Sequence, residues 1–174
     1  MKIILLSGWM QSGKDTVANI LVSKYGYKRY AFADVLKDQT SNVFNIPRDL
    51  MDTDEGKKTV FHDKTVRMHL IDYGQACRAI NPLCWVDPVC SSIQSETECD
   101  KFVITDWRMP NEGDEIIRRF GSDNVVTCRV QRWQSPPLVN YTENALDDYP
   151  FDVCLLNLAS LDDLETRVIE QFNF

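Results

Sequence analysis

The residues with the clearest chemical potential form a short segment near the N-terminus, Gly8-Trp9-Met10-Gln11-Ser12-Gly13-Lys14. Its spacing is G-x4-G-K, and it lies between an apolar run over residues 2–7 and a helical pattern over residues 14–24. A loop of this kind binds phosphate, because successive backbone N–H groups wrap the anion and the helix N-terminus adds a favourable dipole. The lysine then reaches the β- and γ-phosphates of a nucleotide. The plainer alternative is a glycine turn between a strand and a helix.

The residue that follows the lysine departs from the usual pattern of such loops. A Ser or Thr that holds Mg²⁺ is expected, but the sequence has Asp15, with Thr16 one place later. The Asp15 carboxylate still suits the metal, because Mg²⁺ prefers oxygen ligands. In the alternative, Asp15 is a charge at the helix N-terminus and Thr16 contacts the phosphates. The predicted nucleotide-binding residues of the loop are Gly8, Gln11, Ser12, Gly13, Lys14, Asp15 and Thr16.

A second candidate for chemistry follows the apolar run over residues 101–106, which ends in Asp106 and is followed by Trp107 and Arg108. An acidic residue at the carboxyl end of a strand beside the loop strand is well placed to orient metal-bound water. Alternatively, Asp106 only caps the next loop. We predict Asp15 and Asp106 as metal ligands, and the predicted catalytic residues are Lys14, Asp106 and Arg108.

Two arginines provide a candidate site for a second anion. Arg67 and Arg78 are eleven residues apart in a helix predicted over residues 64–80. Eleven residues are nearly three turns, so both side chains face the same way and are able to clamp a phosphate group. Gly74 lies between them, where a closely approaching ligand would explain its presence.

This second site has structural alternatives. Taken alone, each arginine is better interpreted as a surface residue paired with Asp63, the predicted N-cap of the helix, or with Asp72. Trp85 either stacks on a base or packs in the core. The arginines therefore indicate a functional site only when they are considered together.

The elements that position these residues alternate between strand and helix. Near-continuous apolar runs suit strands covered on both faces, and strand–helix alternation predicts a parallel sheet with right-handed crossovers. Ser160 is the predicted N-cap of the last helix, with Asp163 in the capping-box position. The predicted strands are 2–7, 28–33, 101–106, 124–130 and 152–157, and the predicted helices are 14–24, 34–44, 64–80, 111–120 and 161–172.

The fold class predicted from this pattern is α/β, with the three layers of a P-loop NTPase. A parallel sheet of roughly five strands has helices on both faces. We expect one domain over residues 1–174, with an acceptor-binding insert at 45–95 and a short lid at 131–147. The two polar, turn-rich stretches at 45–63 and 131–150 are expected to be functional loops.

The composition and net charge of the chain limit the ligands, partners and location that we expect for it. The chain has 174 residues, of which 44% are hydrophobic and 26% charged, as in ordinary globular domains. No apolar run approaches the ~20 residues of a membrane span, and no secretory signal is apparent, so we expect a cytoplasmic protein with reduced cysteines rather than three disulfides. The net charge of −7 argues against nucleic acid as a partner and favours a small anionic ligand. The oligomeric state, including a homodimer, stays open.

Five segments taken together resemble the deoxynucleoside monophosphate kinases of bacteriophages and large DNA viruses. That family also has Asp after the loop lysine. Animal phosphomevalonate kinases are similar at the G-K-D and acid-x-Arg pieces, so they are the nearest competing substrate class. The resembling segments are residues 7–16, 32–37, 73–86 and 105–112, together with Thr142-Glu143, Phe151-Asp152 and Asn157.

The resemblance implies ATP and Mg²⁺ at the loop and a deoxynucleotide as acceptor. It also implies that Arg132 lies against adenine and that Asp106 and Arg108 lie between the two substrates. The chain departs from the family at Val35, Met109 and Asn140. The acceptor-binding residues that the resemblance implies are Asp34, Lys37, Arg67, Gln75, Arg78, Trp85 and Arg108.

The predicted function is therefore the ATP-dependent phosphorylation of a deoxynucleoside 5′-monophosphate to the diphosphate, in the synthesis of DNA precursors. Two alternatives remain at this point. One is a small-molecule kinase for another acceptor, similar to phosphomevalonate kinase. The other is a non-catalytic protein that binds nucleotides.

Overall fold

The structure is a computed structural model that describes residues 1–132 and 144–172. It divides into two units, one formed by Met1–Ala31 with Cys90–Phe174 and the other by Phe32–Val89. The predicted organisation, one domain with an insert at 45–95, stays a prediction. The predicted lid at 131–147 lies mostly outside the described residues.

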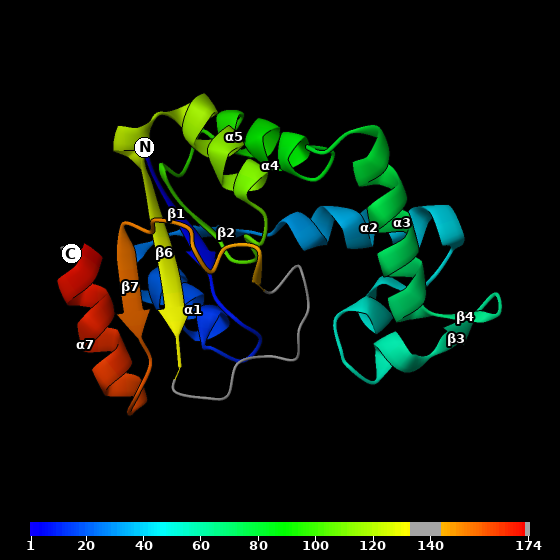
Figure 1. The fold of residues 1–174 in the computed structure, drawn as a ribbon, viewed down its shortest axis with the longest axis horizontal. Helices are drawn as coiled ribbons and strands as arrows, with labels where there is room; N and C mark the ends of the chain where they lie inside the picture. Colours follow the sequence, from blue (N-terminus) through cyan, green and yellow to red (C-terminus); the bar gives the residue numbers. More distant parts are fainter. Residues whose placement is uncertain (133–143, 173–174) are drawn as a thin grey trace. The chain divides into compact units, whose positions relative to one another are not determined.

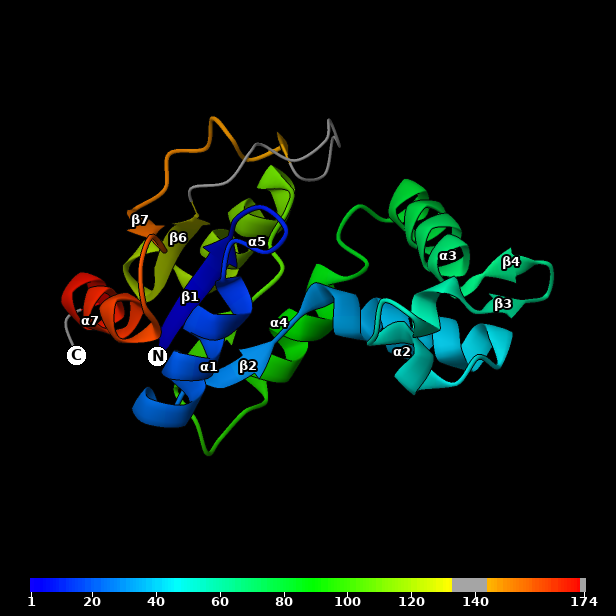
Figure 2. The same ribbon diagram turned by 90° about the horizontal axis from the view of Figure 1, so that it is seen from below.

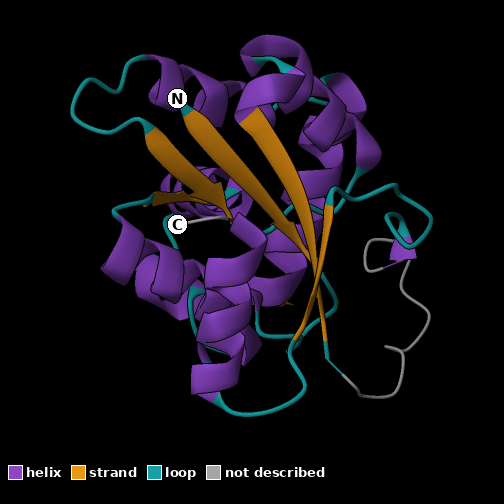
Figure 3. Cartoon of the chain, turned by 90° about the vertical axis from the view of Figure 1, so that its left-hand side faces the viewer, coloured by secondary structure: helices purple, strands orange, loops and turns teal. Residues whose placement is uncertain are grey.

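The first unit is built on a parallel sheet of five strands in the order β2-β5-β1-β6-β7 (Figure 1). Helices cover both faces of this sheet (Figure 3), which confirms the predicted fold class. The direction of the strand order reverses at β1, and ligands of such sheets bind outside the carboxyl ends of the strands at this point. The strands are β1 (Lys2–Ser7), β2 (Lys28–Tyr30), β5 (Lys101–Ile104), β6 (Val125–Gln131) and β7 (Val153–Leu156).

The helices of this unit that flank the sheet are α1 (Lys14–Tyr25), α5 (Pro110–Phe120) and α7 (Leu161–Phe172). Helices α1 and α7 lie side by side (Figure 2). Alternate residues of β1, Ile4 and Leu6, are buried in one core cluster with residues of these two helices such as Leu21 and Val168. The cluster anchors the base of the phosphate loop, because β1 enters the loop and α1 leaves it.

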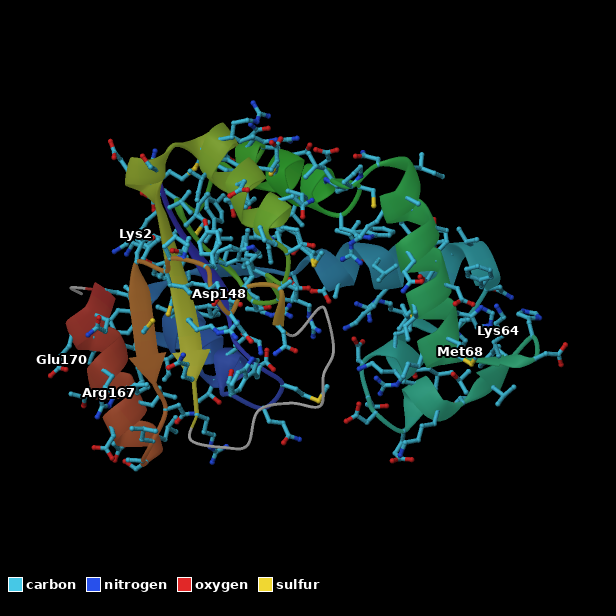
Figure 4. The ribbon with its side chains drawn as sticks, viewed as in Figure 1. Lys2, Lys64, Met68, Asp148, Arg167 and Glu170 are labelled. Atoms are coloured by element: carbon cyan, nitrogen blue, oxygen red, sulfur yellow. The ribbon has the colours of Figure 1, made fainter. Side chains whose placement is uncertain are left out.

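The last helix begins and ends with contacts that fix its position. The Ser160 Oγ accepts from the Asp163 backbone N–H at 3.2 Å, and the Asp163 carboxylate accepts from the Ser160 N–H at 3.1 Å, which confirms the predicted capping box. At the other end, the Lys2 ammonium group donates to the Phe172 carbonyl at 3.2 Å (Figure 4). Helix α7 is thereby tied to the first residue of β1.

The second unit contains two long helices, α2 (Phe32–Phe44) and α3 (Val66–Ile80), and the short hairpin of β3 (Val60–Phe61) and β4 (Lys64–Thr65). Two 3-10 segments, Arg48–Met51 and Gly56–Lys58, lie in the stretch that we predicted to be a loop. A small core of Ile46, Met51 and Val66 joins these elements.

Two predictions about α3 are wrong. The helix is capped by Thr65, whose hydroxyl accepts from the Met68 N–H at 3.2 Å, and not by Asp63, which has a φ of 66° before β4. Gly74 does not indicate an approaching ligand. A Cβ at Gly74 would lie 3.3 Å from the Leu36 side chain, so this glycine allows α3 to pack against α2.

Helix α4 (Val86–Gln94) was missed, and four strands are displaced or shorter than predicted. The first turn of α4 contains Pro88, where a missing N–H costs no helical hydrogen bond. Strand β2 ends at Tyr30 because α2 begins at Phe32, and β5 ends at Ile104, so Asp106 lies in the following loop. No helix in the described parts of the chain is long and apolar enough to cross a membrane.

Candidate active site

The phosphate loop follows β1 directly, at the carboxyl edge of the sheet, and opens α1 as predicted. Its backbone takes conformations that favour glycine, with a φ of 149° at Gly8 and 103° at Gly13. Gln11 also has a positive φ, of 63°, which is uncommon for a residue with a side chain. Such conformations turn successive N–H groups toward one point, which is the geometry that an anion requires.

Lys14, in the first turn of α1, is held over the loop. Its ammonium group donates to the carbonyl oxygens of Gly8 at 2.6 Å and of Trp9 at 2.7 Å. The cation is therefore fixed beside the backbone that would surround a phosphate chain. Asp15 is exposed at the start of the same helix, and Thr16 is half-buried.

Ser12 provides the test of whether this loop fits a phosphate. Its hydroxyl oxygen is buried and has no hydrogen-bond partner among the described residues. A buried polar group without a partner is costly, so the site gains when an acceptor such as a phosphate oxygen is present. The loop residues therefore fit the nucleotide phosphates that the spacing predicts.

Asn157, which follows β7, holds the loop from the other side. Its side-chain amide donates to the Ser12 carbonyl at 3.0 Å, and its backbone N–H donates to the Gln131 carbonyl at 2.7 Å. A Cβ at Gly13 would overlap the Asn157 amide. The absence of a side chain at Gly13 is thus required both by its φ and by this contact.

Asp106 and Arg108 follow β5, the neighbour of β1 in the sheet, so they lie at the same edge as the loop. Buried Glu112 fixes the backbone here, because its carboxylate accepts from the N–H groups of Arg108 and Met109, each at 3.1 Å. Trp107 is buried and donates its indole N–H to the Met109 carbonyl at 2.8 Å. The segment that follows Asp106 is therefore held in place by these contacts.

A Gly113→Ala substitution is expected to destabilise this segment. A Cβ at Gly113 would overlap the Trp107 ring and lie 2.6 Å from its Cε2 atom. Forcing extra atoms into a packed core typically costs about 1–3 kcal/mol. The free energy of unfolding, measured by urea denaturation, should fall by that amount. The exposed neighbour Asp114 provides the control, because Asp114→Ala in the same helix should change the free energy much less.

The predicted metal ligands are compatible with Mg²⁺. In residues 1–132 and 144–172, no group of three His, Cys, Asp or Glu side chains could hold a metal ion. Mg²⁺ commonly binds through one or two carboxylates and the substrate phosphates, so a protein cage is not required. Asp15 and Asp106 are the residues that would hold it, and the ion would neutralise charge on the transferred phosphoryl group.

Arg132, the predicted adenine contact, is exposed at the end of β6. Two other residues at this edge were not predicted from the sequence. Arg129 on β6 is buried and forms an ion pair with Asp147. Neither residue belongs to a local motif, and only their juxtaposition in the fold reveals them.

The predicted acceptor residues Asp34, Lys37, Arg67, Gln75, Arg78 and Trp85 all lie in the second unit. On α2, Lys37 lies 3.7 Å from the Asp34 carboxylate and 2.9 Å from that of Asp52. Arg48 also contacts both carboxylates, at 3.4 Å from Asp34 and 2.7 Å from Asp52. These ion pairs lower the pKa of Asp52 to about 2.

Arg67 and Arg78 both belong to α3, where eleven residues of spacing place them on one face. Arg67 pairs with the exposed Asp54 at 3.2 Å, not with Asp63 or Asp72. Trp85 is buried and its ring centroid is 6.0 Å from that of Tyr73, which favours the core interpretation of this residue.

Lys57 is a cation of the second unit that sequence reasoning missed. Its ammonium group is half-buried and has no hydrogen bond or ion pair within the described residues. Burial, together with the nearby charges of Lys37 and Arg67, lowers the pKa of Lys57. Lys57 therefore lies near two other cations, together with the carboxylates of Asp52 and Asp54 that pair with them.

The fold is that of the P-loop kinases, and together with a family match it supports a phosphotransferase. The family model for deoxynucleotide monophosphate kinases matches residues 2–65. This match confirms the predicted resemblance to that family over the region that includes the loop, Asp34 and Lys37. No curated protein sequence matches the chain.

Solved structures with the same fold align along nearly the whole chain. TT1252 from Thermus thermophilus is 19% identical with a TM-score of 0.57, and the alignment covers 99% of this chain and 96% of that one. Dephospho-CoA kinase from Campylobacter jejuni is 10% identical with a TM-score of 0.59 and the same coverage. A gluconokinase from Sinorhizobium meliloti is 11% identical with a TM-score of 0.52, with 99% and 91% covered. At these identities the likeness establishes the fold alone.

Proposed function

We propose that this protein transfers the γ-phosphoryl group of ATP to a deoxynucleoside 5′-monophosphate and releases ADP and the deoxynucleoside diphosphate. The observation that carries the proposal is the family match over residues 2–65, which includes the phosphate loop and the first acceptor residues. The acceptors named for the similar structures, dephospho-CoA and gluconate, differ from one another, so the fold by itself does not select the acceptor.

The donor side of the proposal is supported by the loop geometry. Lys14 neutralises charge on the β- and γ-phosphates, and Ser12 donates its buried hydroxyl to a phosphate oxygen. Phosphoryl transfer depends mainly on positioning and on charge stabilisation, so a strong general base is not required. Asp106 orients metal-bound water and Arg108 contacts the transferred group.

The acceptor side is supported by the cations of the second unit. Arg67 and Arg78 share one face of α3, and Lys57 lies close enough to Lys37 and Arg67 for their charges to lower its pKa. Two arginine forks bind a phosphate monoester through paired hydrogen bonds. The surrounding aspartates, Asp34 and Asp52, hold Lys37 and Arg48 until the acceptor arrives.

We further propose that the enzyme acts in the cytoplasm on free nucleotides and not on nucleic acid. The net charge of −7 supports this, because a protein that binds polynucleotides needs a broad basic surface. Phage or viral origin and a homodimeric state stay predictions from the sequence.

A panel of acceptors tests the proposed reaction. A coupled assay of ADP release with each deoxynucleoside monophosphate, each ribonucleoside monophosphate and phosphomevalonate should give turnover only with nucleotides. We expect kcat/KM to favour the deoxy form, because a pocket that closes over C2′ leaves a ribose hydroxyl buried without a partner, at a cost of about a few kcal/mol. A pocket that only tolerates the hydroxyl would discriminate less, by roughly tenfold to a hundredfold. Tyr73 and Gln75 are the side chains proposed to close it, with buried Trp85 packed behind Tyr73.

The panel also separates the alternatives. Turnover with phosphomevalonate alone would mean that the acceptor is not a nucleotide. Equal rates for the ribo- and deoxyribonucleoside monophosphates would mean that the enzyme is a nucleotide kinase without deoxyribose preference. Binding of ATP without turnover of any acceptor would favour a non-catalytic nucleotide-binding protein.

A further inference from the structure

Arg129 is a buried cation in the middle of the first unit that the proposed chemistry does not use. It lies on β6 opposite Ser7 of β1, and its side chain is 6% exposed. One guanidinium nitrogen donates to the Ser7 Oγ at 3.1 Å, and another forms an ion pair with the carboxylate of Asp147. A buried arginine is costly unless it is paired in this way, so its environment needs a specific explanation.

The contacts of Arg129 connect it to the phosphate loop. Trp9, the second residue of the loop, donates its indole N–H to the same Asp147 oxygen at 3.2 Å. The Arg129 guanidinium carbon lies 5.7 Å from the centre of the Trp9 ring and 5.7 Å from that of Phe151. These are the distances of cation–π contacts, so Arg129 holds both the carboxylate and the ring of the loop tryptophan.

Trp9 in turn sets the position of the catalytic cation. Its backbone carbonyl accepts from the Lys14 ammonium group at 2.7 Å and from the Ser12 N–H at 3.1 Å. A change in the Trp9 conformation would therefore move an acceptor of Lys14 and a hydrogen bond of the loop. The contacts form one chain from Arg129 through Asp147 and Trp9 to Lys14.

Asp147 belongs to the segment 144–151, which also contains Asp148 (Figure 4). Asn144 donates its side-chain amide to the second Asp147 oxygen at 2.9 Å, so both carboxylate oxygens are occupied. Segment 144–151 is thus joined to the loop through one carboxylate, and not only through the sheet.

We propose that Arg129 is a positioning residue of the phosphate loop, which acts through Asp147 and Trp9 to hold Lys14 and the loop ready for ATP. The proposal rests on the proposed function only in taking ATP as the ligand of the loop. It assigns to the 144–151 segment a part in nucleotide affinity that is independent of the acceptor.

Arg129→Met and Asp147→Asn test the proposal, with ATP and ADP binding measured by calorimetry in the absence of acceptor. Each substitution removes a charge-assisted contact, so we expect the Kd for ATP to rise by about tenfold or more. The KM for the acceptor should change by less than about twofold. Arg129→Lys keeps the charge but cannot bridge Ser7 and Asp147, and it should give an intermediate loss.

Two controls separate positioning from stability. Thr127→Val, on the same strand as Arg129, removes the two hydrogen bonds that the Thr127 hydroxyl forms with the carboxylate and the N–H of Asp152, and it should lower stability without changing the Kd for ATP. Trp9→Phe keeps the ring but loses the indole N–H, so it should share part of the loss seen with Asp147→Asn. If Arg129→Met does not fold, Arg129→Lys and Asp147→Asn carry the test.

The proposal is overturned if Arg129→Lys and Asp147→Asn bind ATP as the wild type does, or if every variant raises the acceptor KM as much as the Kd for ATP. Failure of the proposed function has a different signature, since it would appear as absence of ATP binding or of turnover in the wild-type protein itself.

Discussion

A Lys14→Met variant is expected to lose phosphoryl transfer while keeping its fold. Methionine has a similar length but no charge, so the variant loses the ammonium group that lies over the loop carbonyls of Gly8 and Trp9. Charge on the transferred phosphoryl group must be stabilised by such fixed cations, and removal of one group of this kind typically lowers kcat by about a hundredfold to a thousandfold. The loss should appear in kcat as well as in kcat/KM, because the interaction is strongest in the transition state.

Single-turnover and coupled ADP-release assays measure this effect, and thermal unfolding checks the fold. Lys24→Met is the matched control, because Lys24 is an exposed lysine of the same helix that pairs with Glu165 at 2.5 Å. The control should retain normal turnover. Turnover of Lys14→Met within a few-fold of the wild type would mean that the loop does not hold the donor phosphates.

Arg78→Ala is expected to affect the acceptor far more than ATP. Arg78 lies in the last turn of α3, on the face that it shares with Arg67. Loss of charge-assisted hydrogen bonds to a phosphate costs roughly 1.5–3 kcal/mol, which corresponds to about a tenfold to hundredfold rise in KM for the monophosphate. The KM for ATP should stay within about twofold.

Lys64→Ala provides the comparison for Arg78. Lys64 precedes the same helix (Figure 4) and pairs with Asp72 at 2.5 Å on the exposed surface. An exposed pair contributes little, so neither KM should change. Equal changes in both KM values for Arg78→Ala, or no change in either, would assign Arg78 to a structural role.

Much of the fold follows from local pattern in the sequence. Each of the five strands of the main sheet and five of the helices overlaps the range that periodicity predicts, although four strands are shorter or displaced, and the Ser160–Asp163 box sets the start of α7. Helix α4 escaped prediction because Pro88 and β-branched residues obscure its periodicity. The β3–β4 hairpin escaped because each strand has only two residues.

The candidate site likewise contains some residues that local sequence patterns predict and others that they do not. The loop from Gly8 to Lys14 is contiguous, so its spacing alone identified it. Arg129, Asp147 and Lys57 act through partners distant in the sequence or through burial, and neither property has a local signature. The role of Gly74 was misread for the same reason, because its neighbour Leu36 lies on another helix.

The two units of the fold differ in how the chain builds them. The unit with the phosphate loop is assembled from two separated stretches, whereas Phe32–Val89 is one uninterrupted stretch. Because every acceptor residue proposed in α2 and α3 belongs to that stretch, a single exchange of coding sequence would replace this whole set and leave the loop, Asp106 and Arg129 untouched. The architecture therefore permits new acceptor preferences to arise by recombination of one gene segment, without rebuilding the machinery that handles ATP.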